Sequence, residues 1–296
     1  MLRTLALAAA ALLLTVGATP APIDGTVPCV DQLMDIHGNP VGADLVIFAG
    51  GNQWFVMPEL VAAFQHAHPE VKHVFYETLP PGLLAQQIEN GALRIGEMTL
   101  SLHADVYLSG KKRMDAMRTA GLVGAPVTYA TNELAIMVRA GNPKHIATLA
   151  DLGRADVRVS MPNPKTEGIA RQIELAYEKA GGKALDATIM QRKVADGTTH
   201  LTQIHHRQTP MWLLDGSADA GPVWLSEALY QERIHSGLIA VRIPARDNVR
   251  AIYLGATVTG APHSRAAQAF VNFLTTPTAA AIYRSYGFAS PQSTEE

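Results

Sequence analysis

The feature that most constrains this chain is the alternation, from residue 42 onward, of short β-branched runs with amphipathic runs at helical spacing. Residues 44–49 are almost wholly apolar and end at two glycines, which is typical of a buried strand. Residues 57–66 then carry apolar side chains at the spacing of one helical face. The β-α-β-α-β order predicts a parallel sheet with helices on both faces. The other elements of this unit are a strand at 71–76, a helix at 81–88 and a strand at 104–108.

The same rhythm continues to the C-terminus, so we predict an α/β fold for the whole chain. The pair Gly181-Gly182 is a stop signal for a long helix that begins at Thr166. Pro277 interrupts the terminal helical stretch at 264–286. The remaining predicted strands are 132–139, 157–161, 189–194, 220–224, 238–243 and 251–257, and the remaining short helices are 149–152 and 210–214.

The first residues have the pattern of a secretory signal. Arg3 precedes an apolar stretch at 5–16, and small residues follow at 17–21. The stretch is shorter than the roughly 20 residues that cross a bilayer, although a buried N-terminal helix is an alternative. We expect cleavage near Ala18 or Ala21 and an exported protein. The single cysteine, Cys29, excludes an internal disulfide and a multi-cysteine metal site.

Charge and motifs exclude several function classes. With 24 Lys+Arg against 26 Asp+Glu, the chain lacks the basic surface that a nucleic-acid binder needs. It contains no G-x-S-x-G, H-E-x-x-H, Walker or G-x-G-x-x-G motif, and no acid/base pair stands out. We therefore expect neither an enzyme nor a bound cofactor.

Ligands of doubly wound sheets bind beyond the carboxyl ends of the strands, where helix N-termini present free N–H groups. At the first such junction, glycines allow close approach, amides can donate and an indole can form a wall. The second junction offers the free N–H of Gly82, which follows two prolines. The third junction offers Thr166 as a helix N-cap. At each junction, the alternative to a binding site is an ordinary turn with a purely structural role. The predicted binding residues are Gly51, Asn52, Gln53, Trp54, Gly82, Thr166, Glu167 and Gly168.

The densest polar segment is 198–209. If a strand here leads into a helix at Pro210 with Thr209 as its N-cap, then His206 and Arg207 lie at a helix N-terminus that favours an anion. The alternative to an anion site is a solvent-exposed loop without a binding role. A transition-metal site is a third possibility, but histidines five residues apart align poorly on a strand or a helix. The metal candidates are His103, His200, His205 and His206.

Several segments, in this order, resemble the type II periplasmic substrate-binding proteins of ABC transporters, in particular the molybdate-binding group. The likeness extends from Leu45 to Phe288. The segments that carry it are 48–51 with 68–71, 104–109, 129–134 with 141–143 and 149–152, 215–224, and the terminal stretch 267–288.

This resemblance implies two doubly wound lobes joined by a hinge. The implied division is a signal peptide at 1–21, an extension at 22–41, lobe 1 at 42–128 plus 250–296, and lobe 2 at 129–249. In that family, uncharged N–H groups and hydroxyls hold an oxyanion between the lobes. Trp224 stands where the family has a tyrosine. The resemblance also implies a periplasmic monomer that delivers a small anion to an ABC permease.

The chain departs from the family at two places that concern the ligand. Molybdate binders usually have serines at the first two junctions, where this chain has glycine, asparagine and proline. The cluster at 205–207 is also unlike theirs. An exported transition-metal binder, an accessory protein and an enzyme of the same fold therefore stay open as alternatives.

Overall fold

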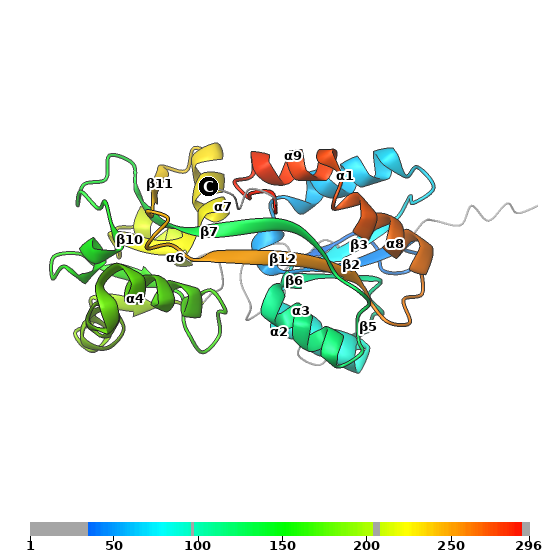
Figure 1. The fold of residues 1–296 in the computed structure, drawn as a ribbon, viewed down its shortest axis with the longest axis horizontal. Helices are drawn as coiled ribbons and strands as arrows, with labels where there is room; N and C mark the ends of the chain where they lie inside the picture. The colour runs from blue at the N-terminus through cyan, green and yellow to red at the C-terminus, as the bar shows by residue number, and fades with distance from the viewer. Residues whose placement is uncertain (1–34, 96–97, 204–207, 292–296) are drawn as a thin grey trace, which may run out of the picture.

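The computed structural model describes residues 35–95, 98–203 and 208–291. At one end of the molecule, β2 (Leu45–Ala49) lies between β3 (Val74–Glu77) and β6 (Val106–Gly110) and pairs with both in parallel. The short β1 (Ile36–His37) adds to β3 in the antiparallel sense. The parallel sheet predicted from the alternation is therefore confirmed. We call this part lobe 1 (Figure 1).

Helices cover both faces of the lobe 1 sheet. On one face, α1 (Met57–Ala67), α8 (Ser264–Phe273) and α9 (Pro277–Ser285) bury Phe64, Phe270 and Tyr283. On the other face, α2 (Pro81–Asn90) and α3 (Lys111–Thr119) bury Leu84 and Met114. Figure 1 shows the two layers above and below the sheet. The helix break expected at Pro277 separates α8 from α9.

Lobe 2 repeats this plan around β10 (Ala220–Trp224). This strand pairs in parallel with β8 (Val159–Met161), which in turn pairs in parallel with β9 (Thr199–Leu201). One face packs on α4 (Ala170–Ala187), and the other on α6 (Gln208–Leu214) and α7 (Leu225–Arg233). The last strand of this lobe is β11 (Leu238–Arg242).

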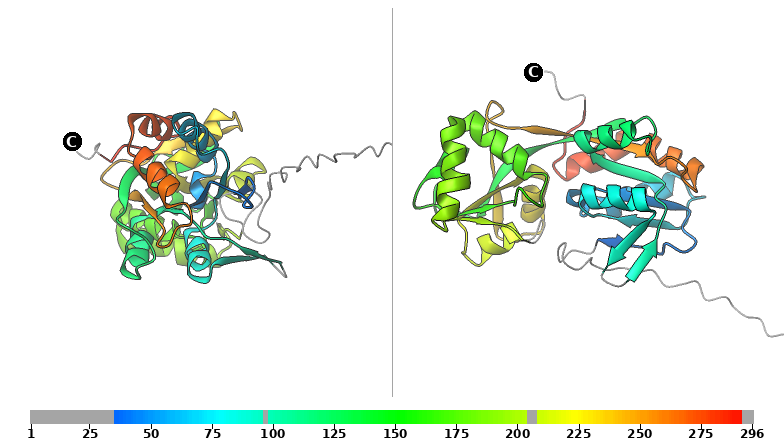
Figure 2. Two further views of the ribbon diagram at one scale, coloured as in Figure 1. Left: turned by 90° about the vertical axis from the view of Figure 1, so that its right-hand side faces the viewer. Right: turned by 90° about the horizontal axis from the view of Figure 1, so that it is seen from below.

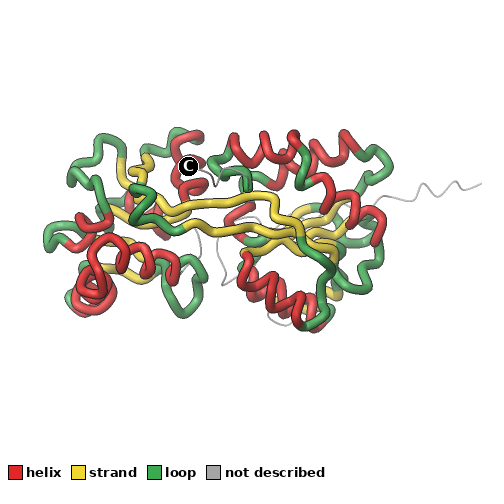
Figure 3. Tube along the Cα trace, viewed as in Figure 1, coloured by secondary structure: helices red, strands yellow, loops and turns green. Residues whose placement is uncertain are grey.

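Two long strands connect the lobes. β7 (Val127–Arg139) and β12 (Arg250–Thr257) pair with each other in the antiparallel sense, with a bulge between Tyr253 and Leu254. β12 also pairs with β6 in lobe 1, whereas the far half of β7 pairs with β10 and β11 in lobe 2. The result is one sheet that runs through both lobes, and Figure 3 shows the crossing pair in yellow. Seen from below, the two lobes lie at opposite ends of this pair (Figure 2).

The structure corrects the strand predicted at 189–194. The chain forms helix there instead, as η3 (Thr188–Arg192) and α5 (Lys193–Ala195). The glycine pair does interrupt the long helix, since Gly182 has φ +68°, but helix resumes directly after it. Ile189 is still buried, and the Lys193 ammonium donates to the carbonyls of Arg154 and Val157. The apolar residues at 189–194 therefore indicated a buried segment correctly, but they did not distinguish a helix from a strand.

Several elements were not predicted. Among them are α3, α7 and an antiparallel pair formed by β4 (Ala92–Ile95) and β5 (Met98–Ser101). The strand considered within 198–209 is β9. The short helix expected at 149–152 is η2 (Leu149–Gly153). Of the helices in the described ranges, none is both long and apolar enough for a membrane span.

Candidate functional site

The carboxyl ends of β2, β3 and β6 meet at one edge of lobe 1, and a helix begins after each of them. The first is the short η1 (Gly51–Gln53), which leads into α1. The second and third are α2 and α3. Helix N-termini carry unpaired N–H groups and a partial positive charge, so this edge has the character of an anion site.

At the first junction, the Gln53 side chain is completely buried and fixed by two phenols. Its Oε1 accepts from the hydroxyls of Tyr129 at 2.8 Å and Tyr283 at 2.9 Å. Burial raises the pKa of both tyrosines, so both remain protonated donors. Within the described ranges, the Gln53 Nε2 has no hydrogen-bond partner. This amide is therefore oriented by its oxygen, with its nitrogen left as a buried donor.

The Gln53 nitrogen faces the gap between the first two junctions. A Cβ on Gly50 would stand 3.7 Å from Gln53 Nε2 and 3.3 Å from Pro81 Cγ. Glycine at this position leaves that space to a neighbouring group. Gly51, the first residue of η1, is buried beside it.

The Asn52 side chain contacts the strands that connect the lobes. Its Nδ2 donates to the hydroxyl of Tyr253 on β12. On the adjacent strand, Asn132 donates to Ser226 at the start of α7. Asn52 thus ties the first junction to the strands that connect the lobes.

The second and third junctions come together at Gly82. This residue is half-buried in the first turn of α2, and a Cβ on it would stand 3.4 Å from Nη2 of Arg113 on α3. Tyr107 on β6 donates to the carbonyl of Pro81 at 2.7 Å, and burial raises the pKa of Tyr107 to about 12. Ser109, on the same face of β6, is buried at the end of the strand.

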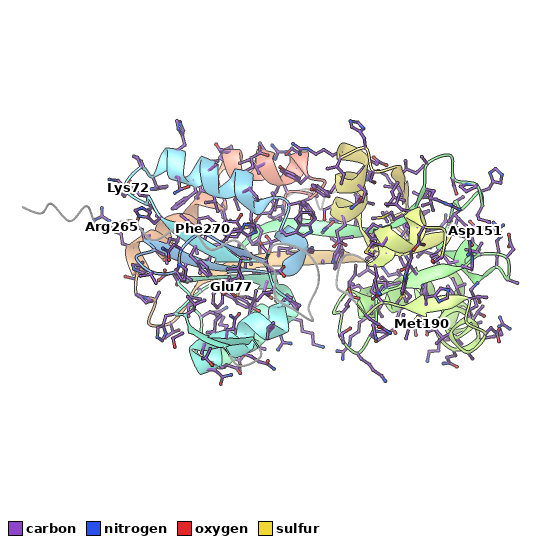
Figure 4. All side chains as sticks on the ribbon, turned by 180° about the vertical axis from the view of Figure 1, so that it is seen from behind. Lys72, Glu77, Asp151, Met190, Arg265 and Phe270 are labelled. Carbon is purple, nitrogen blue, oxygen red and sulfur yellow. The ribbon has the colours of Figure 1, made fainter. Side chains whose placement is uncertain are left out.

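Beneath α2, the same edge carries a buried acid, Glu77, which Figure 4 labels in lobe 1. Burial raises the pKa of Glu77 to about 7, and the amide of Gln87 offsets part of that shift. Glu77 therefore titrates close to neutral pH.

In lobe 2, the predicted helix start at Thr166 is wrong. Residues 163–169 form turns in which the N–H groups of Thr166 and Glu167 donate to the carbonyl of Asn163, and α4 begins only at Ala170. Thr166 and Gly168 are exposed. Glu167 is buried and accepts a hydrogen bond from the hydroxyl of Thr202.

The helix at Pro210 exists, but Thr209 is not its N-cap. α6 already begins at Gln208, and the Thr209 hydroxyl is hydrogen-bonded to Ser160 at 2.8 Å. A Cβ on Gly221 would stand 2.5 Å from the Thr209 methyl group, so β10 and α6 pack very closely here. His205, His206 and Arg207 lie outside the described residues.

A narrow cleft lies where the two lobes face each other. Three of the predicted binding residues line it, namely Trp54, Glu167 and Thr209. Lobe 1 contributes Trp54 and Phe55, and both rings contact Tyr230 of α7, each with its centroid 4.9 Å from that of Tyr230. The cleft therefore combines an aromatic wall with polar groups from lobe 2. Its other lining residues are Met137, Pro162, Ile169, Thr202, Pro210, Val223, Glu227 and Gln231.

Trp224 does not line this cleft. It ends β10, is only 8% exposed and packs edge-on against Tyr253 with ring centroids 6.4 Å apart. Its backbone N–H donates to Glu227 at 3.3 Å. A tryptophan at this place fills the junction between β10 and the crossing strands.

The structure does not bring the predicted metal ligands together. His103 lies beside Gly91 at a small cavity in lobe 1, and His200 packs against Trp212 in lobe 2. Within the part of the chain that the structure describes, no three His, Cys, Asp or Glu side chains group as a metal site would require.

Sequence reasoning missed Arg113, Ser109 and Tyr230. The first two belong to the third strand-to-helix junction of lobe 1. The rule that identified the other junctions would have found them. Tyr230 lies on α7, whose helical spacing went unnoticed after a strand that ends in Trp224.

Comparison with known proteins agrees with this architecture. The family described as "Bacterial extracellular solute-binding protein" matches residues 45–289. The molybdate-binding protein ModA of Mycobacterium tuberculosis is 28% identical over 251 residues, which cover 83% of this chain and 85% of that protein.

Solved structures show the same fold. The periplasmic molybdate-binding protein of Azotobacter vinelandii superposes with a TM-score of 0.64 at 17% identity, over 84% of this chain and all of the other. The sulfate-binding protein SubI of Mycobacterium tuberculosis does so with a TM-score of 0.64 at 23% identity, over 84% of this chain and 86% of the other. This chain belongs to the bacterial extracellular solute-binding proteins of ABC transporters and has the type II periplasmic-binding fold.

Proposed function

We propose that this protein is exported, captures a small molybdate-like oxyanion between its lobes and delivers it to an ABC permease without chemical change. The observation that carries the proposal is the Gln53 amide, whose oxygen is held by two phenols while its nitrogen is a buried donor with no partner among the residues that the structure describes. A buried N–H that lacks an acceptor is unfavourable, so a site that offers one is complete only when an acceptor binds.

The surroundings of Gln53 favour a negative charge. α2 and α3 begin at the same edge, and each contributes free N–H groups and a positive dipole end. The relatives named above for molybdate and sulfate support an oxyanion as the ligand. The apolar stretch at 5–16 supports export.

Capture needs the lobes to close on the ligand. We assign residues 42–128 and 250–296 to lobe 1 and residues 129–249 to lobe 2, with β7 and β12 as the hinge. Of the ligand contacts predicted on lobe 2, the proposal retains Glu167 and Thr209, which line the cleft, together with His206 and Arg207. A ligand that contacts both lobes binds the closed state better and so shifts the population toward it.

A binding screen tests the proposal. Molybdate, tungstate, sulfate and phosphate are titrated by calorimetry and thermal shift, with zinc, copper and nickel salts as the competing class. We expect at least one oxyanion to raise the melting temperature and the metals to leave it unchanged. Stabilisation by a metal and by none of the anions would contradict the proposal.

Gln53→Glu sharpens the test, because it keeps the oxygen that the phenols need and replaces the donor nitrogen by a carboxylate oxygen. We expect it to weaken oxyanion binding by about 100-fold or more, since a donor becomes a negative charge. Tyr283→Phe is the matched control. It removes one phenol from Gln53 Oε1 but leaves the nitrogen in place, so binding should fall by less than about tenfold.

A further inference from the structure

The chain that follows α9 returns to the strands that connect the lobes. α9 ends in a turn in which the N–H of Gly287, at φ +86°, donates to the carbonyl of Arg284 at 3.0 Å. Ala289 then exchanges two backbone hydrogen bonds with Thr131 on β7, at 2.8 and 2.9 Å. Thr131 lies close to the point where β7 changes its partner from β12 to β10. Residues 286–289, which we call the terminal segment, therefore lie at the proposed hinge.

The first residue of the terminal segment links the two lobes. The Arg233 guanidinium on α7 lies over the Tyr286 ring, with Cζ 4.3 Å from the ring centroid. The Tyr286 hydroxyl donates to Oε2 of Glu59 on α1 at 2.9 Å. Tyr286 is thus held between a cation of lobe 2 and a carboxylate of lobe 1. In Figure 1, both α7 and α9 lie above β7.

Gly287 packs directly against α7. A Cβ on it would stand 2.6 Å from Leu229 Cδ1 and 3.4 Å from Ser226 Cα, and both residues belong to α7. The first of these distances is shorter than a van der Waals contact. Ser226 in turn accepts a hydrogen bond from Asn132 on β7 at 2.9 Å. Glycine at this position therefore adopts the φ that the turn requires and also lets α7 lie close to lobe 1.

α7 also forms part of the cleft wall. Glu227, Tyr230 and Gln231 lie on this helix and line the cleft together with Trp54 and Phe55 of lobe 1. The distance between α7 and lobe 1 therefore sets the width of the cleft. A ligand held by both lobes binds the closed arrangement best, so its apparent affinity falls when the population of that arrangement falls.

We infer that the terminal segment sets the spacing of the lobes, and that Gly287 is the position that controls it. Gly287 is not among the residues that line the cleft, so it acts on ligand affinity through the position of α7. The effect on affinity rests on the proposed function, whereas the effect on lobe spacing does not.

Gly287→Asn tests the inference. Asparagine enters the left-handed region more readily than most residues with a Cβ, so the turn is kept while a side chain enters the contact with α7. Double electron–electron resonance measures the lobe spacing without ligand, between spin labels at Arg118→Cys on α3 and Glu178→Cys on α4. Both positions are exposed, and Cys29→Ser removes the single native cysteine. We expect a longer label distance and, in calorimetry, about tenfold weaker molybdate binding.

Gly260→Asn is the matched control. Gly260 lies in lobe 1 at φ +77°, and a Cβ on it would meet nothing within 4 Å, so this variant makes the same backbone demand without displacing a neighbour. It should leave the label distance unchanged and molybdate binding within about twofold. Adding Leu229→Ala to Gly287→Asn removes the atom nearest to the new side chain. Both measurements should then return to those of Leu229→Ala alone.

Arg233→Gln is a second variant, and it leaves the turn intact. It removes the cation from the Tyr286 ring, so the label distance should again lengthen. Arg246→Gln, in a loop of lobe 2 where the side chain is 83% exposed, should leave the distance unchanged.

The outcomes separate this inference from the proposed function. If an oxyanion binds but Gly287→Asn and Arg233→Gln behave like their controls, the oxyanion carrier stands and the role of the terminal segment is refuted. If no oxyanion binds but both variants lengthen the label distance, the terminal segment sets the spacing and the proposed function is refuted.

Discussion

The two lobes share one plan but hold their cleft-facing edges in different ways. The edge of lobe 1 is fixed by buried hydrogen bonds that come from distant elements, such as Tyr129 on β7 and Tyr283 on α9 to Gln53. The edge of lobe 2 is a series of turns with exposed Thr166 and Gly168, in which Glu167 is held by Thr202. We therefore expect the first edge to be preformed and the turns at 163–169 to adjust more readily. A ligand would therefore bind first to the preformed edge of lobe 1, and the edge of lobe 2 would then adapt to the bound ligand.

The largest expected effect tests the claim that lobe 1 is fixed by its buried network. Gln53→Leu leaves the phenols of Tyr129 and Tyr283 buried without an acceptor, and we expect it to lower the free energy of unfolding by about 3–4 kcal/mol. Urea denaturation followed by circular dichroism measures the change. A loss below 1 kcal/mol would show that the network does not fix this edge.

The next prediction concerns Glu77, whose pKa burial raises to about 7. A carboxyl with a raised pKa in the folded state stabilises the fold while it is protonated, so stability should fall as the pH rises from about 4.5 to about 7. Glu77→Gln should remove this slope and raise stability at pH 8 by about 3 kcal/mol. Glu89→Gln, at an exposed position on the neighbouring helix α2, should leave the slope unchanged. Urea titrations at pH 5, 6, 7 and 8 distinguish the two variants.

A third prediction addresses the contact between the lobes. Tyr230 packs on Trp54 and Phe55 across the cleft, and it is half-buried. Tyr230→Ala should lower the free energy of unfolding by about 2 kcal/mol and increase the radius of gyration in small-angle scattering. An unchanged scattering curve would mean that the crossing strands alone set the spacing of the lobes.

The smallest effect is expected in lobe 2. Thr202→Val removes the hydroxyl that donates to Glu167 and accepts from the N–H of Asn163, and the edge can relax around it. We expect a loss of about 1 kcal/mol, measured by the same urea assay. A loss as large as that of Gln53→Leu would remove the distinction between the two edges.

Most of the architecture could be predicted because alternating apolar runs constrain a parallel sheet strongly. The strand at 220–224 was predicted residue for residue. Residues 189–194 were misassigned because a short apolar run is buried equally well as helix or strand, and the packing of α4 decided between them. Thr166 and Thr209 looked like helix caps, yet one lies in a turn and the other bonds to a neighbouring strand.

The candidate site was harder to predict, because it depends on which junctions meet in space. Gln53 was identified, but nothing local indicates that two tyrosines far along the chain hold its oxygen. Arg113 looks like an ordinary exposed residue, and only the approach to Gly82 sets it apart. Long-range contacts of this kind leave no pattern in a single sequence.

β7 also bears on how the molecule unfolds. Residues 127–133 of this strand pair with β12, and residues 134–138 pair with β10, so one continuous backbone segment belongs to both lobes. If either lobe unfolds, the other loses part of the pairing of its central strand β7. We therefore expect the lobes to unfold in one transition, so that a substitution at the lobe 1 edge lowers the stability of both lobes.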